Sequence, residues 1–221
     1  LLKFRFYVLA ASVTLIFVGS GSLFLIAVTL KDLSSEFGWP REVPSLAFSL
    51  QFIGGGMGGI LMGYLLDRVG AVVLPLIAAC AIATGSVLTT FVDEQWQLFA
   101  IYFVLFGFLG QGSLYAPLMA NISRWYDRRR GMVVGIVASG QSLSGIVWPP
   151  IFGVAITEIG WRNGFIGFGI IAACNIALWI SVVLMPVPQT ISTPKERPRL
   201  RDLWPRLIDY KEAFRLFLIP S

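Results

Sequence analysis

The chain has 221 residues, of which 56% are apolar, and a mean hydropathy of +0.77. This composition excludes an ordinary soluble domain and predicts a membrane protein. The sequence contains no histidine, which removes most metal sites, Ser-His-Asp hydrolysis and histidine proton relays, and its two cysteines cannot build a disulfide framework. We therefore expect no catalytic residues, no metal site and no cofactor.

Six stretches contain no lysine, arginine, aspartate or glutamate, and each exceeds the roughly 20 residues that a helix needs to cross a bilayer. In chain order they are Phe6–Leu30, Val43–Leu66, Val69–Val92, Gln95–Ser123, Gly131–Thr157 and Asn163–Pro194. Pro186 and Pro188 would end the sixth helix near Met185. The sequence predicts an all-α membrane protein, with six transmembrane helices in residues 1–185 and a connector in residues 186–221.

The basic residues are distributed unevenly between the two sides of these predicted helices. Fourteen lie before the first helix or after the second, fourth and sixth, whereas the opposite side holds only Lys31, Arg41 and Arg162. A basic excess marks the cytoplasmic side, so both termini are expected in the cytoplasm. This distribution explains the net charge of +5 without a nucleic-acid partner.

A short glycine-rich sequence occurs twice. Gly19–Phe24 (GSGSLF) in the first stretch returns as Gly110–Tyr115 (GQGSLY) in the fourth, at an offset of 91 residues. The first and fourth helices cross in opposite directions, as a 3+3 inverted repeat requires, and such repeats are typical of secondary transporters that hold their substrate near the midplane. The alternative is chance similarity between two glycine-rich apolar helices.

Several motifs carry a family resemblance. Gly63, Asp67, Arg68 and Gly70 stand in the loop after the second helix, in the pattern G-x-x-x-D-R-x-G. This loop resembles the signature of the major facilitator superfamily, and the resemblance implies that it gates transport. The fifth stretch carries Gly145, Pro149, Pro150 and Gly153, similar to the fifth-helix motif of that superfamily.

Three further segments resemble the monocarboxylate and oxalate–formate branch of the superfamily: Phe37–Arg41, Trp125–Gly140 and Gly160–Arg162. The resemblance implies that the chain is the N-terminal half of a twelve-helix transporter. A missing C-terminal six-helix half is then a partner, and the connector runs into the start of a seventh helix. Phe108 replaces the fourth-helix arginine of the family, so the proton-coupling role of that arginine is not carried over.

In the resembled architecture, helices one and four line a central cavity, and helices two and five flank it. Polar and aromatic groups at mid-membrane depth are costly unless they face water or a partner. By this test the substrate-binding candidates are Ser20, Ser22, Phe24, Gln111, Ser113, Tyr115, Gln141, Ser142 and Trp148. The serines and the glycine run of residues 54–63 have an alternative role in close helix packing.

The expected function is secondary active transport of a small organic anion, a mono- or dicarboxylate, by alternating access. A coupling proton or an exchanged anion would accompany it, and the expected location is a bacterial inner membrane. No charged residue lies within these helices, so the substrate charge would be met by the second half or by helix dipoles. The alternatives are a six-helix scaffold or receptor that transports nothing, and an inactive transporter fragment. No enzyme activity is expected.

Overall fold

Nine helices follow one another in residues 2–69, 73–126 and 130–183, the part of the chain that the computed structural model describes. They are α1 (Leu2–Gly19), α2 (Gly21–Phe37), α3 (Glu42–Val69), α4 (Val73–Thr89), α5 (Gln95–Ala100), the π-helix η1 (Ile101–Gln111), α6 (Gly112–Trp125), α7 (Arg130–Ile159) and α8 (Trp161–Val183). Gly70 and the expected connector of residues 186–221 lie outside the described residues, so both stay predictions.

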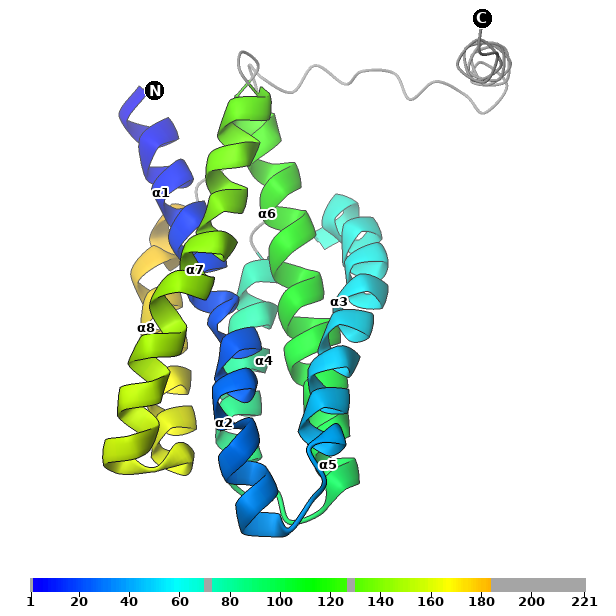
Figure 1. Ribbon diagram of the computed structural model, residues 1–221. Coiled ribbons are helices and arrows are strands. Elements are labelled where there is room, and N and C mark those ends of the chain that lie inside the picture. Colours follow the sequence, from blue (N-terminus) through cyan, green and yellow to red (C-terminus); the bar gives the residue numbers. More distant parts are fainter. Residues whose placement is uncertain (1, 70–72, 127–129, 184–221) are drawn as a thin grey trace, which may run out of the picture. The chain divides into compact units, whose positions relative to one another are not determined.

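The chain runs up and down the bundle in alternate directions (Figure 1). α1 begins near one end, and the turns from α2 to α3, from α4 to α5 and from α7 to α8 all lie at the other end. Two of the passes are interrupted. Ser20 separates α1 from α2 in the first pass, and α5, η1 and α6 follow one another in the fourth.

Four helical segments of the described chain are long and apolar enough to cross a membrane: Phe6–Phe37, Glu42–Leu66, Gln95–Ser123 and Arg130–Ile159. They coincide with the first, second, fourth and fifth predicted helices. In place of the third stands α4 with 17 residues, and in place of the sixth stands α8 with 23. An all-helical membrane protein is thus confirmed, whereas the full set of six transmembrane helices stays a prediction.

Glycine and proline mark several of the helix boundaries. Gly38 and Gly160 have φ angles of +64° and +81°, a left-handed conformation that suits glycine and lets α2 and α7 end in sharp turns. Pro44 lies in the first turn of α3 and Pro75 in the first turn of α4, where the missing amide proton costs no helical hydrogen bond.

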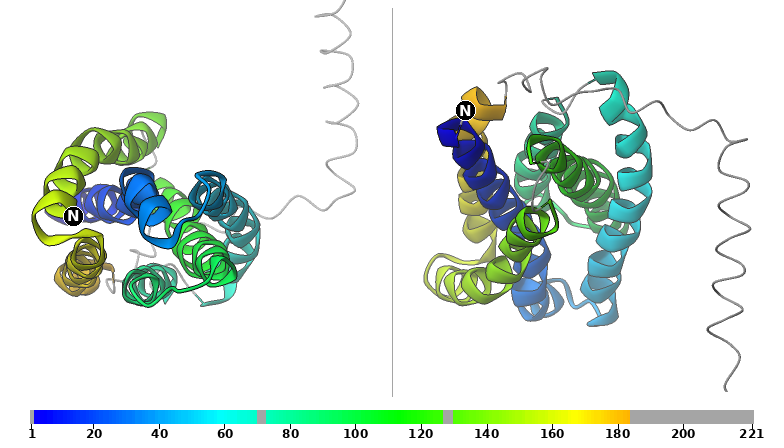
Figure 2. Two further views of the ribbon diagram at one scale, coloured as in Figure 1. Left: turned by 60° about the horizontal axis from the view of Figure 1, so that its bottom comes forward. Right: turned by 90° about the horizontal axis from the view of Figure 1, so that it is seen from above.

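The helices pack through a few extensive contacts (Figure 2). α3 lies along η1 and α6, α7 lies along α1 and α2, and α4 lies against both α8 and η1. The view on the left of Figure 2 places α2 between α7 on one side and α3 on the other. The interrupted first pass therefore occupies the middle of the bundle, and its residues are more deeply buried than those of α3 or α7.

Glycines bring the backbones of α3 and its partner into direct contact. A Cβ atom at Gly58 would lie 2.1 Å from the carbonyl oxygen of Phe108, and one at Gly54 would lie 2.3 Å from the carbonyl oxygen of Phe103. From the opposite helix, a Cβ at Gly112 would lie 2.7 Å from the carbonyl carbon of Gly58. No other residue type fits at these positions without movement of a helix, because the obstructing atoms belong to the backbone.

The glycine run of α3 is therefore divided between two faces. Gly54, Gly55 and Gly58 contact the neighbouring helix, in line with the expected packing role. Gly56, Gly59 and Gly63 have no atom within 4 Å of a Cβ position. Only one face of the glycine run packs closely against another helix in the described residues.

An ion pair joins the end of α2, just before the Phe37–Arg41 segment, to the Gly160–Arg162 segment at the start of α8. Glu36, near the end of α2, accepts hydrogen bonds from the indole of Trp161 and from the guanidinium of Arg162. The same guanidinium donates to the carbonyl oxygen of Thr90 (3.3 Å). Glu36 and Arg162 are 39% and 44% exposed, so the pair itself contributes about 1 kcal/mol or less. Its structural effect is to connect the ends of α2 and α4 to the start of α8.

Gly58→Ala is expected to lower the free energy of unfolding by about 1–3 kcal/mol, because its Cβ would push two backbones apart. The matched control is Gly59→Ala, which adds the same methyl group one residue further along, where nothing lies within 4 Å. The control should change stability by less than about 0.5 kcal/mol. Thermal unfolding of the purified chain in detergent, followed by circular dichroism, measures both. Equal losses in the two variants would contradict the glycine contact.

Candidate substrate site

A buried hydrogen bond joins the first helical pass to the second. The side-chain amide nitrogen of Gln51, on α3, donates to Ser22 Oγ on α2 over 2.9 Å, and Ser22 in turn donates to the carbonyl oxygen of Gly19 (3.1 Å). Gln51 is fully buried and Ser22 is 1% exposed. Gln51 Oε1 has no hydrogen-bond partner among the described residues. One acceptor in this polar pair is therefore unused.

A second amide lies nearby on the opposite helix. The Cβ of Gln111, at the junction of η1 and α6, lies 3.1 Å from the Cβ position of Gly55. Gly55 follows Gln51 by four residues and shares its face of α3. Gln111 Nε2 is buried and has no partner in the described chain. The contact between α3 and the fourth pass thus carries one unused acceptor and one unused donor on neighbouring turns.

Leaving such atoms unpaired is expensive. An unsatisfied buried amide group costs about 1–3 kcal/mol, and the cost is higher in hydrocarbon, where water is absent. Ser113, also a candidate, has a buried Oγ without a partner among the described residues. Gln51, Gln111 and Ser113 would each gain a hydrogen bond from a ligand or a water molecule with complementary groups.

Trp148 occupies the core of the bundle. Its side chain is 4% exposed and stacks on Phe17 and Phe152, with ring centroids 5.6 and 4.9 Å away, and it meets the edge of Phe168 at 5.5 Å. Its indole nitrogen donates to the carbonyl oxygen of Phe17 over 3.0 Å. Both the ring and the donor are already used, so in this conformation Trp148 fixes α7 against α1.

The remaining candidate side chains differ in their exposure to solvent. Ser20 is 1% exposed at the junction of α1 and α2. Ser142 and Tyr115 are exposed, the latter by 36%, and Gln141 and Phe24 are half-buried. The accessible candidates are therefore on the second half of the fourth pass, on α7 and on the edge of α2.

The structure brings only some of the candidates together. Ser22 reaches Gln51, and the ring of Phe24 lies 2.9 Å from the Cβ position of Gly145. No hydrogen bond in the described chain connects the candidates of α2 with Gln111, Ser113 or Tyr115 of the fourth pass. The two halves of the internal repeat thus contribute separate groups to the site.

The fifth-helix motif lies within α7. Pro149 and Pro150 interrupt its hydrogen-bonding pattern near the middle of the helix. Gly145 lies against the Phe24 ring, whereas Gly153 has no atom within 4 Å of a Cβ position. The first part of the motif therefore serves the packing of α7 on α2.

The expected gate is only partly described. Arg68 donates to the hydroxyl of Tyr64, one turn earlier on α3, and its guanidinium lies 4.8 Å from the centroid of that ring. Gly63 has open space on its Cβ side. The side chain of Asp67 lies outside the described part, so its partner stays a prediction. The aromatic hydroxyl of Tyr64 was not anticipated as the partner of the arginine.

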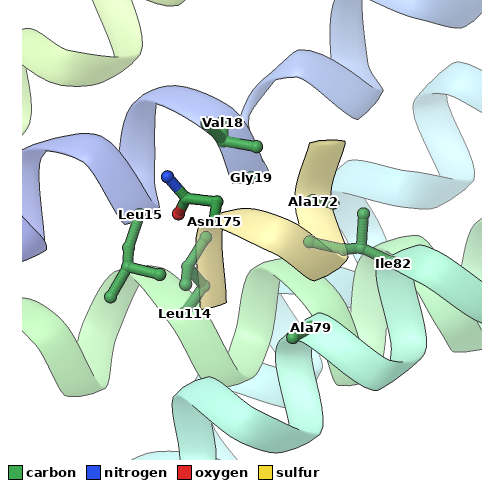
Figure 3. Close-up of a pocket in the computed structure, with 8 residues that line it drawn as sticks. All are labelled: Leu15, Val18, Gly19, Ala79, Ile82, Leu114, Ala172 and Asn175. Atoms are coloured by element: carbon green, nitrogen blue, oxygen red, sulfur yellow. The ribbon is translucent and has the colours of Figure 1, made fainter. Parts of the chain in front are cut away.

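A cavity of about 10 Å³ lies between α1, α4, α6 and α8 (Figure 3). It is lined by Leu15, Val18, Gly19, Ala79, Ile82, Leu114, Ala172 and Asn175. Its volume is close to the minimum for one water molecule, which needs at least two polar partners, and Asn175 is the one polar side chain of this lining. The cavity is a packing gap and cannot hold an organic substrate.

Gln51 was missed at the level of sequence. It is a polar residue near the middle of the second stretch, and the depth test applied to helices one, four and five would have selected it. Its pairing with Ser22 could not be predicted, because the rotation of α3 against α2 is not encoded in a helix that is apolar on nearly all faces.

Comparison with known proteins identifies related sequences. The family model of the Major Facilitator Superfamily matches residues 10–220. The MFS-type transporter pynF of Aspergillus niger is 35% identical over 82% of this chain and 38% of its own length. The Fujikurins efflux protein of Gibberella fujikuroi is 32% identical over 76% of this chain and 34% of its own. The Riboflavin transporter RibJ of Trypanosoma brucei brucei is 24% identical over 53% of this chain and 22% of its own.

The chain thus spans less than half the length of each of these curated relatives. None of the three is named for a monocarboxylate. Two come from fungi and one from a trypanosome, so the expected bacterial inner membrane has no support in them.

Ser22→Ala is expected to cost about 1–3 kcal/mol of stability, because it leaves the whole side-chain amide of Gln51 buried and unpaired. The double variant Ser22→Ala/Gln51→Leu removes both partners and should recover most of that loss. Thermal unfolding in detergent, with Ser45→Ala on the exposed start of α3 as the control, measures the difference. A double variant that is less stable than Ser22→Ala alone would contradict the assignment of an unsatisfied amide.

Proposed function

The chain belongs to the major facilitator superfamily, and we propose that it forms one six-helix half of a secondary transporter that carries a small organic anion by alternating access. The superfamily and the named relatives are transporters, so the expectation that the chain is not an enzyme is confirmed. The observation that carries the proposal is the position of the two helix interruptions within the internal repeat.

These interruptions fall at equivalent places. Ser20, which separates α1 from α2, and Gln111, the last residue of the π-helix, are the second residues of the two repeated sequences, 91 positions apart. Irregular backbone at membrane depth is stable only where it lies inside protein or lines a cavity. In transporters built from repeats, such interruptions lie at the substrate site.

Packing supports the same 3+3 arrangement. An inverted repeat exchanges the first three passes with the last three, so each contact between passes should have a counterpart. α3 packs on η1 and α6, and its counterpart α7 packs on α2 and α1. α4 contacts η1 and α6, and its counterpart α8 contacts α1 and α2. The α4–α8 contact is its own counterpart, as expected for the pair nearest a two-fold axis.

The substrate would lie between this half and a second six-helix half, next to Tyr115, Gln141 and Ser142, which are accessible or half-buried. Gln111 and Gln51 would bind it when alternating access opens the contact between α3 and the fourth pass. Both termini would lie in the cytoplasm: Arg68 and Arg130 stand at one end of the bundle, and the acidic loops stand at the other.

An anionic substrate would need a compensating positive charge at its binding site. The six uncharged stretches offer amides, hydroxyls and aromatic rings, and no cationic side chain. The countercharge would then come from the second half or from helix N-termini. The same stretches contain no carboxylate or histidine, so exchange of anions is favoured over a proton carried on this half.

A second candidate substrate is an uncharged polar metabolite that is exported. The uncharged donors and acceptors at Gln51 and Gln111 suit hydroxyl and carbonyl groups without any countercharge. Two relatives are named as efflux proteins, for fujikurins and for agnestins. Their identities to this chain are 32% and 28%, which supports a shared mode of transport more than a shared substrate.

Reconstitution in proteoliposomes tests both candidates. Vesicles that contain the product of the complete gene should exchange labelled mono- or dicarboxylates if the substrate is an organic anion. They should accumulate neutral compounds rich in hydroxyl and carbonyl groups if the substrate is an uncharged metabolite. Gln111→Leu should reduce the transport rate roughly five- to tenfold, because one hydrogen bond to the substrate is lost. It should not reduce thermal stability, because the lost amide nitrogen is unpaired in this structure.

Gln95→Leu is the matched control, since Gln95 is exposed at the start of α5, away from the repeat junction. It should transport like the parent. Normal transport by Gln111→Leu would contradict the site, and failure of the parent with every solute would favour the non-transporting scaffold.

A further inference from the structure

An apolar groove of about 310 Å³ lies where α4 turns into α5, remote from the candidate substrate residues in sequence. Its walls are formed by Leu88 and Phe91 on one side and by Trp96, Ala100 and Ile101 on the other. The volume matches the lower end of the range for small-molecule sites. Phe91 is 72% exposed and Trp96 is 63% exposed, so two aromatic rings stand at its rim.

The position of the groove in the sequence fixes its depth in a membrane. The third uncharged stretch ends at Val92, and the fourth begins at Gln95. Asp93 and Glu94, between them, mark the water boundary, and the groove extends from there along the apolar ends of the helices. Exposed aromatic rings at this depth are typical of the membrane–water interface.

The charge around the groove is negative. Asp93 and Glu94 are both exposed, and the sequence contains no lysine or arginine from residue 69 to residue 123. Arg162 reaches the carbonyl oxygen of Thr90 nearby, but its charge is paired with Glu36. A cationic group would be attracted to this rim, and an anionic one would be repelled.

The carboxylate and the indole at the rim are held in place. Trp96 donates its indole N–H to Glu94, whose carboxylate also caps the first turn of α5. The Gln97 side chain completes the cap, accepting from the backbone N–H groups of Asp93 (3.0 Å) and Glu94 (3.3 Å). The ring face and the carboxylate are therefore preorganised side by side. An aromatic face beside a carboxylate is a favourable site for a quaternary ammonium.

We propose that this groove binds one phospholipid with a choline headgroup. An acyl chain lies along Leu88, Ala100 and Ile101, and the trimethylammonium group lies over Trp96 beside Glu94. The proposal is independent of the transported substrate, because none of these residues belongs to the candidate site.

Native mass spectrometry of the full chain, exchanged into equal amounts of phosphatidylcholine and phosphatidylglycerol, tests the proposal. One phosphatidylcholine should be retained in preference to phosphatidylglycerol. Glu94→Gln and Trp96→Ala should each lower its retention roughly two- to fivefold, the loss expected for one exposed cation–π or charge contact. Glu158→Gln removes an exposed carboxylate at the same end of the bundle and should leave retention unchanged.

Trp96→Phe keeps an aromatic ring and replaces Trp96→Ala in the test if that variant does not fold. Trp96→Phe should retain more lipid than the double variant Glu94→Gln/Trp96→Phe. Retention of phosphatidylcholine at the parent level by Glu94→Gln and the tryptophan variants would overturn the proposal. Equal retention of phosphatidylcholine and phosphatidylglycerol by the parent would also overturn the proposal. Occupation of the groove by a second copy of the chain would do the same.

Discussion

The direct contact between the backbones of α3 and the fourth helical pass is the constraint on which the other features depend. Within hydrocarbon the hydrophobic effect does not drive helices together, so close approach through small residues must supply the attraction. Gly54 and Gly58 meet carbonyl oxygens of the opposite helix at distances that exclude any side chain. This contact sets the rotation of α3, and the rotation decides that Gln51 faces Ser22 and that Gln111 lies one turn away.

The counterpart contact, between α7 and the first pass, uses the same chemistry with different residues. A Cβ at Gly140 would lie 2.9 Å from the carbonyl oxygen of Val13, and Gly145 receives the ring of Phe24. Each interrupted pass is thus supported along its length by one long helix. Such support allows a break at Ser20 and a π-helix before Gly112 to persist at membrane depth, where an unsupported interruption would expose unpaired backbone groups.

The charge-free stretches predicted where most of the helices lie, because charged side chains are costly at membrane depth. They ended the first and fifth helices at Leu30 and Thr157, whereas α2 continues to Phe37 and α7 to Ile159, each followed by a glycine with a positive φ angle. The sequence could not show that Gly58 packs against another helix and Gly59 does not. Both are glycines in an apolar helix, and only the neighbouring backbone distinguishes them. Sequence reasoning also placed Trp148 among substrate contacts, whereas its indole is bound to Phe17 inside the bundle in this conformation. The partner of a buried polar group depends on helix rotation, which an apolar pattern leaves undetermined.

The end of α2 and the start of α7 must lie on opposite sides of the membrane if the two triplets of helices are inverted. Ser35→Cys and Arg130→Cys, each in a background with Cys80 and Cys174 replaced by serine, can be labelled with a membrane-impermeant maleimide in intact cells. The cysteine at position 35 should react from outside, and the one at position 130 only after permeabilisation. Reaction of both from the same compartment would contradict the inverted arrangement and the site built on it.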